Sequence, residues 1–407
     1  MTLTTNILLT LGSVCSLFLA IYWVVGLLQI RASLGQLPTA RDGLALAAAN
    51  PPAASVCVVV PAHNEEAVIA TLIRSLRAQE YPNLRVVLAL DRCTDDTVEI
   101  ARREIADDAR FTIVHVRGCP KRWAGKVNAV WRGVFRSGAL DADLLLFADA
   151  DTIFDPGCVR ASVALLEDRK LDLLSLVSTL THDRWFELLA QPAAGLELLR
   201  QYPLLKSNRE NDRRPFANGQ FMLFRKSTYV AIQGHPLVHA EILEDLAFAL
   251  NVDRLRYRPG VLLADGMLTC RMYHSWPEFK KGWMRIFSEA ASRKPDRLRV
   301  SAWSLRGILT ALPTAAMLTL AGGMTLAPER LWPWLGQVAT ILSGVALAVW
   351  LVAMVTIVRL GKGPAWTALA TPIGGWLVGG IMLRAARNLE RGRPTEWGNK
   401  QYTRDAR

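Results

Sequence analysis

The sequence predicts an α/β domain built on a mostly parallel sheet, with membrane-spanning helices at both ends of the chain. Between residues 55 and 150, short apolar runs alternate with helical patterns, which is typical of βαβ units. Acidic residues follow several of these runs, at the strand ends where such sheets bind ligands. Long uncharged runs lie near both termini, and the first, Ile7–Ile30, is long enough to cross a bilayer.

The composition agrees with a membrane-associated protein. The chain has 407 residues, of which 51% are hydrophobic, and a formal net charge of +12. A basic balance suits anionic lipid headgroups, sugar-nucleotide diphosphates or nucleic acid. The basic residues gather near the apolar runs rather than along a groove, which argues against a nucleic-acid partner. Six cysteines without a Cys-x-x-Cys pair argue against a zinc site or a disulfide framework and favour a reducing compartment.

The first apolar run is interpreted as a transmembrane anchor. A cleaved signal peptide is the rival interpretation, but the run lacks a basic start and is longer than a usual signal core. Arg31 and Arg41 follow it, so the positive-inside rule places the next segment in the cytosol. We expect residues 1–50 to form this anchor and a linker, with the Ala/Gly/Pro-rich linker composition covering 31–54.

Residues 51–300 are expected to form the cytosolic domain. The predicted strands are Val56–Val60, Leu84–Leu90, Phe111–Val116, Leu144–Ala148 and Phe221–Phe224. Helical patterns follow in the expected places: through Ala78, over Asp95–Glu104 and Gly125–Phe135, and from about Glu241. Residues 184–206, interrupted by two prolines, predict two short helices.

Asp149 and Asp151 end the Leu144–Ala148 strand. At i and i+2 of an extended chain, their side chains project to the same side. Two hard oxygen ligands in this position suit Mg²⁺ or Mn²⁺ that also carries phosphate oxygens. The alternative is a solvated turn, in which Asp is common.

Five further residues suit the transfer of a sugar from a nucleotide diphosphate. Asp91 follows a strand and suits hydrogen bonds from a uracil-type base or a ribose, although a helix N-cap is its plain alternative. Lys126, like Arg122, suits neutralisation of phosphate charge. Asp245 suits a general base on the acceptor hydroxyl, whereas Glu244 beside it fits a helix-dipole role as well.

Taken together, these motifs resemble the family 2 glycosyltransferases of the GT-A fold. Val58-Val-Val-Pro-Ala-His-Asn-Glu-Glu66 resembles their first strand and loop, and Phe147-Ala-Asp-Ala-Asp151 resembles their Asp-x-Asp motif. Asp91…Asp95-Asp96-Thr97 resembles the second nucleotide-binding signature, with Leu90 in place of the first acid of the usual pair. The resemblance spans roughly residues 55–290. It implies a nucleotide-diphospho-sugar transferase fold, nucleotide-sugar binding by Pro61, Ala62, Glu65, Asp91, Lys126 and Asp149, a metal at Asp149 and Asp151, acceptor binding by Gly219, Gln220 and Trp283, and catalysis by Asp245 with Glu244.

Several details resemble the membrane enzymes that glycosylate hopanoids, carotenoids and ceramide. They are Trp123-Ala-Gly-Lys-Val-Asn-Ala129, Tyr202-Pro203, Gly234-His235, Arg271-Met-Tyr273 and Trp397-Gly398…Tyr402. This resemblance implies an inverting transfer of a single sugar to a lipid hydroxyl. Lys280-Lys-Gly-Trp283 replaces the Gln/Arg-x-x-Arg-Trp motif of many relatives, which disfavours the alternative of a polysaccharide synthase. A nucleotidyltransferase and a catalytically silent, nucleotide-binding membrane scaffold are the remaining alternatives.

The C-terminal part, residues 301–407, is expected to hold two or three membrane spans and a basic tail. Its uncharged runs are Gly307–Pro328, Leu331–Val358 and Gly363–Leu383, the first two joined by a tight turn at 328–330. A third span would place the basic tail outside the cell, against the positive-inside rule, whereas a re-entrant third run would not. Gly375-x-x-x-Gly379 in that run is typical of a helix-packing face.

Before these runs, Trp276, Phe279, Trp283 and Phe287 recur every three or four residues beside Lys280, Lys281 and Arg285. An aromatic stripe is commonly plain core, but the flanking cations favour an interfacial helix at anionic headgroups.

Overall fold

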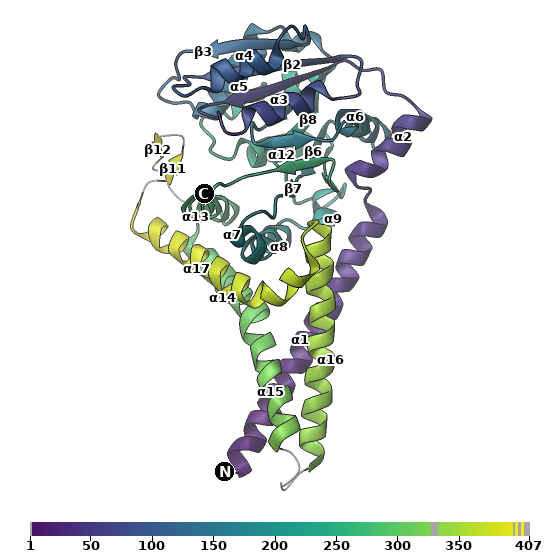
Figure 1. The fold of residues 1–407 in the computed structure, drawn as a ribbon, viewed down its shortest axis with the longest axis vertical. Helices are drawn as coiled ribbons and strands as arrows, with labels where there is room; N and C mark the ends of the chain where they lie inside the picture. The colour runs from purple at the N-terminus through teal and green to yellow at the C-terminus, as the bar shows by residue number, and fades with distance from the viewer. Residues whose placement is uncertain (1, 327–332, 394, 398–399, 403–407) are drawn as a thin grey trace. The chain divides into compact units, whose positions relative to one another are not determined.

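The chain folds into two compact units in the computed structural model, which describes residues 2–326, 333–393, 395–397 and 400–402. The sheet unit comprises residues 36–181 and 202–272, and the helical unit comprises 1–35, 182–201 and 273–407. Figure 1 traces both units along the chain. The predicted turn at 328–330, Gly398 of the C-terminal motif and the last five residues lie outside the described part.

A seven-stranded mixed sheet forms the centre of the sheet unit, in the order β3-β2-β1-β4-β8-β6-β9. Strands β1, β2, β3 and β4 are mutually parallel where they pair, whereas β8 runs antiparallel to both β4 and β6. This arrangement confirms the predicted GT-A-like, mostly parallel sheet. The strands are β1 (Val56–Ala62), β2 (Leu84–Asp91), β3 (Phe111–Val116), β4 (Leu144–Ala148), β6 (Leu173–Val177), β8 (Phe221–Arg225) and β9 (Pro259–Leu263).

The central strands are apolar on both faces because helices cover both. In β1, Val56, Val58 and Val60 pack into one buried cluster, and Cys57 and Val59 pack into another. The first cluster includes residues of α3 (Ile69–Arg77), α4 (Thr97–Ile105) and α6 (Cys158–Asp168), and the second includes residues of α5 (Gly125–Arg136) and α12 (Glu244–Arg254). Uninterrupted apolar strands are typical of parallel sheets that are buried in this way.

Shorter elements complete the sheet unit. A three-stranded sheet joins β5 (Thr152–Phe154), β10 (Leu268–Cys270) and β7 (Thr179–Leu180). The remaining short helices are η1 (Ala40–Asp42), α2 (Gly43–Ala49), η2 (Ala139–Asp141), α9 (Leu204–Ser207), α10 (Lys226–Ala231) and α11 (Gly234–Leu237). The predicted linker is therefore partly helical, because its Ala- and Leu-rich sequence favours a helix once it packs on α6.

Three long helices run side by side in the helical unit: α1 (Thr2–Gln36), α15 (Leu312–Leu326) and α16 (Pro333–Leu360) (Figure 1). The Ser16 and Ser343 hydroxyls lie 2.9 Å apart between α1 and α16. At Gly12 an added Cβ would overlap Thr319 of α15, so the small residue permits close packing. Four helical stretches in the described chain are long and apolar enough to cross a membrane: Leu3–Ala49, Pro295–Thr325, Trp334–Leu360 and Ala365–Glu390.

The other helices of this unit surround an aromatic core. They are α7 (Trp185–Leu189), α8 (Gln191–Gln201), α13 (Trp276–Ala290), α14 (Pro295–Arg306), the π-helical turn η3 (Gly307–Ala311), η4 (Ala365–Ala370) and α17 (Thr371–Glu390), followed by the hairpin β11 (Thr395–Trp397) and β12 (Lys400–Tyr402). In α13, Phe279, Trp283 and Phe287 are buried. Residues of α7, α8 and α17 pack against this aromatic stripe, so the stripe forms core. The interfacial position of α13 stays a prediction.

Candidate active site

The Asp149–Asp151 loop leaves the end of the central strand β4, as the sequence predicts. Thr152 donates a hydrogen bond from Oγ1 to the Asp149 carbonyl (2.7 Å), and the backbone N–H of Arg271 donates to the Asp151 carbonyl (3.1 Å). These bonds fix the loop between β4 and β5. The two carboxylates consequently occupy defined positions at the carboxyl end of the sheet.

Asp151 carries the signature of a cation ligand. Its Oδ1 atom is buried and has no hydrogen-bond partner within the described part of the chain, a costly state for a carboxylate oxygen. Burial, and then the charge of Asp149, raise the pKa of Asp151 to about 7. Burial, and then the charges of Asp151 and Asp149, also raise the pKa of Glu65 to about 8, so several acids repel one another here.

The carboxylates of Asp149 and Asp151 suit a Mg²⁺ or Mn²⁺ ion whose other ligands come from water and a bound phosphate. Within the described ranges, no group of three or more His, Cys, Asp or Glu side chains is arranged to hold a metal. Two carboxylates are what such ions commonly take from a protein when phosphate oxygens and water supply the remaining ligands. Asp149 and Asp151 are therefore suited to a cation that arrives with a diphosphate.

Lys126 links the Asp149 loop to the Glu244–Asp245 pair. It lies in the first turn of α5, and its Nζ is 2.7 Å from Asp149 Oδ1 and 2.6 Å from Glu244 Oε1. Burial opposes its charge, but the ion pairs with Asp149 and Glu244 outweigh burial and raise the pKa of Lys126. The lysine thus remains charged between two acids that come from different elements.

Asp245 is held by backbone amides rather than by a cation. The Gly219 N–H donates to Asp245 Oδ2, and the Leu246 N–H donates to Oδ1, each at 2.8 Å. Burial and the neighbouring Glu244 raise the pKa of Asp245 to about 6, although Lys126 and the two amides act in the opposite direction. Asp245 is half-buried, so it combines partial access with an increased affinity for a proton.

Gly219 lies close to both Lys126 and Asp245. A Cβ added at this position would lie 3.1 Å from Lys126 Nζ and 3.2 Å from Asp245 Oδ2. The next residue, Gln220, is buried, and its side-chain carbonyl accepts hydrogen bonds from Ser178 Oγ and Asn218 Nδ2. The loop before β8 is therefore positioned from inside the unit.

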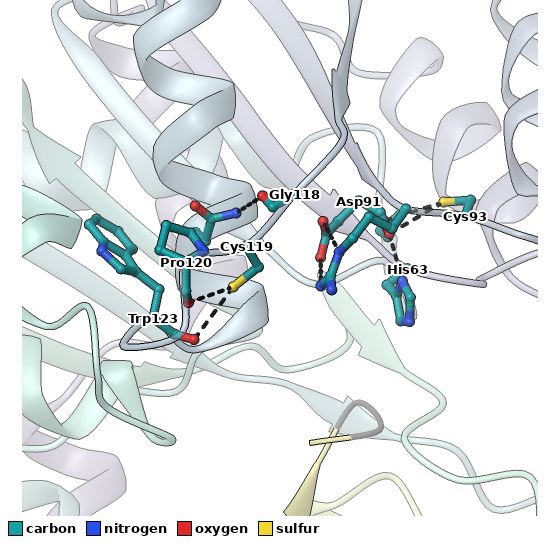
Figure 2. Close-up of polar contacts among 10 residues, drawn as sticks. His63, Asp91, Cys93, Gly118, Cys119, Pro120 and Trp123 are labelled. Atoms are coloured by element: carbon teal, nitrogen blue, oxygen red, sulfur yellow. Dashed lines mark hydrogen bonds and ion pairs between the residues drawn. The ribbon is translucent and has the colours of Figure 1, made fainter. Parts of the chain in front are cut away.

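Asp91 lies at the end of β2, close to the start of α5. It is buried, and both of its oxygens pair with Arg92, at 2.8 Å to Nε and 2.7 Å to Nη2. His63 Nδ1 donates to the Asp91 carbonyl (2.6 Å), and Cys93 lies against the same carbonyl, as Figure 2 shows. An added Cβ at Gly125 would lie 3.9 Å from Asp91 Oδ2, which places Asp91 beside the turn that carries Lys126.

The loop after β1 is tied to the loop after β2. Asn64 Oδ1 accepts from the Thr94 N–H (2.8 Å), and Thr97 Oγ1 accepts from the Glu65 N–H (2.7 Å). Pro61 and Ala62 are the last two residues of β1 and pair in register with Ala89 and Leu90. The residues predicted to bind the nucleotide sugar are thus brought to one edge of the sheet.

Two further residues, Arg92 and His235, contact residues of the candidate site, and the sequence analysis gave neither of them a role. Arg92 pairs with Asp91, and its only sequence signal is its position directly after an acid at a strand end. His235 is buried, accepts from or donates to the Tyr229 hydroxyl at 2.8 Å, and packs edge-on against Phe147 and Phe248. Phe147 precedes Asp149 and Phe248 follows Asp245, so the His235 ring packs between the two elements that carry these acids. Burial, and then the charge of Lys126, lower the pKa of His235 to about 3, so its ring is neutral.

Trp283, predicted to bind the acceptor, belongs to the helical unit. Its indole is buried, and its Nε1 has no hydrogen-bond partner among the described atoms. Its contribution to acceptor binding stays a prediction.

Comparison with known proteins finds a family model that matches part of this chain. Residues 57–231 match the model of glycosyl transferase family 2. Two relatives are the 4,4'-diaponeurosporenoate glycosyltransferases of Staphylococcus aureus (strain bovine RF122 / ET3-1), 25% identical over 254 residues, and Staphylococcus haemolyticus (strain JCSC1435), 24% identical over 246 residues. Each alignment covers 58% of this chain and 62% of the relative, so the chain spans less than two thirds of the relatives' length.

Solved structures with similar folds include the mannosyltransferase PcManGT from Pyrobaculum calidifontis in complex with GDP-Man and Mn²⁺. It is 16% identical with a TM-score of 0.45, and the match covers 95% of this chain and 98% of that chain. Glucosyl-3-phosphoglycerate synthase from Mycobacterium tuberculosis, in complex with Mn²⁺, UDP and phosphoglyceric acid, is 22% identical with a TM-score of 0.39, covering 63% of this chain and 84% of that chain.

Proposed function

We propose that this chain, which carries a glycosyltransferase family 2 domain at residues 57–231, transfers one sugar with inversion from a nucleotide-diphosphate sugar to a hydroxyl of a membrane lipid. One observation carries the proposal. Lys126 lies 2.7 Å from Asp149, which suits a cation and diphosphate, and 2.6 Å from Glu244. The neighbour of Glu244, Asp245, suits a base and accepts from the Gly219 N–H at 2.8 Å. Donor chemistry and acceptor chemistry therefore have their residues within one connected cluster.

The donor binds along the carboxyl ends of β1, β2 and β4. Asp91 accepts hydrogen bonds from the base or ribose, and Glu65 with Pro61 and Ala62 forms the wall beside it. Lys126 neutralises part of the diphosphate charge from the first turn of α5, where the helix dipole favours an anion as well.

Asp149 and Asp151 hold a divalent ion, Mg²⁺ or Mn²⁺. When bound, the ion stabilises the negative charge that develops on the leaving diphosphate. The unpartnered Oδ1 of Asp151 and the mutual repulsion of the acids support this assignment. Asp149 also contacts Lys126, so this lysine would lie beside the phosphate groups of a diphosphate bound at Asp149 and Asp151.

Asp245 is the general base, and Glu244 supports it. Glu244 is committed to its ion pair with Lys126, whereas Asp245 is half-buried with a pKa raised to about 6. Asp245 takes the proton of the acceptor hydroxyl while the hydroxyl oxygen bonds to the anomeric carbon. The bond from that carbon to the diphosphate breaks in the same displacement, and the configuration at the anomeric carbon is inverted.

A lipid acceptor is favoured by the four apolar helical stretches in the same chain. The two Staphylococcus relatives are named for glycosylation of diaponeurosporenoate, a carotenoid. Arg31 and Arg41 after the first apolar helix favour a cytosolic position for the domain, in a multi-pass protein of the cell membrane.

The test is an assay of membranes that contain the chain with a panel of radiolabelled sugar nucleotides. One donor is expected to label a single lipid in the organic extract, and the Asp245→Asn variant is expected to label none. Label in a polymer that stays out of the extract would favour the polysaccharide synthase instead. Nucleotide binding without transfer from any donor would favour a silent scaffold.

A further inference from the structure

Two helices of the helical unit, α14 and α17, run antiparallel beside each other (Figure 1). Arg299 near the start of α14 pairs with Glu390 at the end of α17. Further along, Arg306 Nη2 donates to the Trp376 carbonyl (3.2 Å), and Thr310 Oγ1 of η3 donates to the Pro372 carbonyl (2.6 Å). Contacts therefore follow α17 from its last residue back to its first turn.

Glycines on α17 make this contact close. An added Cβ would lie 2.6 Å from Leu309 Cβ at Gly375 and 2.7 Å from Arg306 Cγ at Gly379. These are the two glycines of the Gly-x-x-x-Gly pattern, which here forms a helix-packing face. The depth of α17 in a membrane is therefore tied to the depth of α14.

Helix α14 is too polar for the hydrocarbon layer. Its twelve residues include Asp296, Arg297, Arg299 and Arg306, and each such charge costs about 3 kcal/mol at the centre of a membrane helix. The uncharged part of α17 itself, Thr371–Leu383, is only about 20 Å long at 1.5 Å per residue, against a hydrocarbon layer of about 30 Å. The uncharged residues before it form the 3-10 turn η4, which packs on α16. Both helices thus suit a shallow position.

The same pair presents an apolar, tryptophan-containing face. Val300 (71% exposed) and Trp303 (59%) lie one turn apart on α14, and Ile373 (55%) and Trp376 (53%) lie one turn apart on α17. The Arg306 guanidinium lies 4.0 Å from the Trp376 ring centre and 5.3 Å from that of Trp303. Tryptophan and arginine together are typical of the layer where lipid headgroups meet acyl chains.

The occupant of this face follows from its continuity with the long helices. Through η3, α14 continues into α15, an apolar helix that packs beside α1 and α16. A membrane around those three helices reaches the shared face of α14 and α17 at its surface. The cationic residues of the pair complement anionic headgroups of that membrane.

We propose that α14 and α17 form an interfacial shelf that lies in the headgroup layer, and that the chain crosses the membrane three times, through α1, α15 and α16. The segment after α17 then ends on the same side as the segment before α14 and as the sheet unit. This resolves the conflict between the basic tail and a third C-terminal span. The inference does not depend on the proposed glycosyl transfer.

The test uses sealed vesicles of one orientation and a membrane-impermeant maleimide. Reporter cysteines are introduced one at a time into the full chain by Asp168→Cys in the sheet unit, Lys362→Cys after α16, Arg391→Cys after α17 and Thr325→Cys at the end of α15. Cys15, Cys93 and Cys119, which are not buried, are replaced by Ala, and the buried Cys57, Cys158 and Cys270 are kept. Asp168→Cys, Lys362→Cys and Arg391→Cys are expected to label from one side and Thr325→Cys from the other. Labelling of Arg391→Cys from the side opposite to Lys362→Cys would overturn the proposal.

Spin labels in nanodiscs give a second, independent readout. At Val300→Cys and Ile373→Cys, the spin label is expected to collide more often with oxygen, which dissolves in lipid, than with a water-soluble nickel complex. This ratio is typical of a shallow position in the lipid. Between Ile373→Cys and Arg384→Cys, a spanning helix would change depth by about 16 Å at 1.5 Å per residue, and the shelf by less than half of that. Preference for the nickel complex at Val300→Cys and Ile373→Cys, or the full depth change, would contradict the shelf.

Discussion

Replacing Gly219 with alanine tests whether the close approach of Lys126 and Asp245 to this glycine matters for transfer. The φ angle of Gly219 is outside the left-handed region, so alanine brings a steric effect without backbone strain. Its Cβ would lie 3.1 Å from Lys126 Nζ and 3.2 Å from Asp245 Oδ2, whereas non-bonded contacts normally begin near 3.5 Å. Each group must therefore move by about 0.3 to 0.4 Å.

The expected result of Gly219→Ala is a decrease in kcat of about tenfold, because a displacement of 1 Å at a catalytic group costs about 100-fold. The assay is the initial rate of lipid labelling with the donor found in the panel, together with the dissociation constant of that donor. Gly195→Ala is the matched control, since an added Cβ meets nothing within 4 Å there. Equal rates in the two variants would refute the reasoning.

Three further perturbations test other parts of the account. Chelation with EDTA is expected to stop transfer and added Mg²⁺ or Mn²⁺ to restore it, because Asp149 and Asp151 suit a divalent ion; full activity in EDTA would contradict the metal assignment. Burial and Glu244 raise the pKa of Asp245 to about 6, so Asp245 loses its base form as the pH falls through 6. The value of kcat/KM should then decrease about tenfold for each pH unit below 6. A flat pH profile down to about pH 4.5 would contradict a base with that pKa. Lys126→Met leaves Asp149 and Glu244 without their shared cation and is expected to lower the free energy of unfolding by about 3 kcal/mol. The control Arg110→Met breaks a more exposed pair with Asp108 and should lower it by about 1 kcal/mol or less. Equal denaturation midpoints of the two variants would contradict the bridging role of Lys126.

Strands β1, β2 and β4 were predictable because each is an apolar run in which nearly every residue is buried, whereas β3 leaves Thr112 and His115 exposed. The five-residue strands β6 and β9 were not predicted. β3 and β4 have the predicted bounds, and β1 and β2 extend the prediction only at their carboxyl ends, where Ala62 and Asp91 still pair. The short strands β5, β7 and β10 were not predicted, because two or three residues carry no periodicity. Their pairing depends on tertiary contacts.

The acids of the candidate site were predictable from their positions after strands, but their partners were not. Neighbouring residues of an extended chain point to opposite sides, so Arg92 was not expected to pair with Asp91. The positive φ of Arg92, 49°, ends the strand and lets its guanidinium return to the preceding carboxylate. Lys126 was expected to contact phosphate, and its bridge between Asp149 and Glu244 joins two residues that lie 95 positions apart in the sequence.

The aromatic stripe of α13 shows the limit of periodicity as a guide. A helix with an aromatic face and a cationic face has the same pattern whether the aromatic side meets lipid or protein. In the structure, Phe279 and Phe287 are fully buried, whereas Trp303 and Trp376, which show no such stripe, are exposed. The pattern of α13 alone therefore did not show that its aromatic side packs against protein.

The most direct test of the central claim is a paired measurement on the Asp245→Asn variant. The variant is expected to bind the donor sugar nucleotide, in the presence of Mn²⁺, about as tightly as the unaltered chain. Its rate of lipid glycosylation is expected to fall by about 1,000-fold or more, as for the loss of a general base. Donor binding lost together with activity, or transfer that continues at the original rate, would contradict the assignment of Asp245 as the base beside a bound, activated sugar.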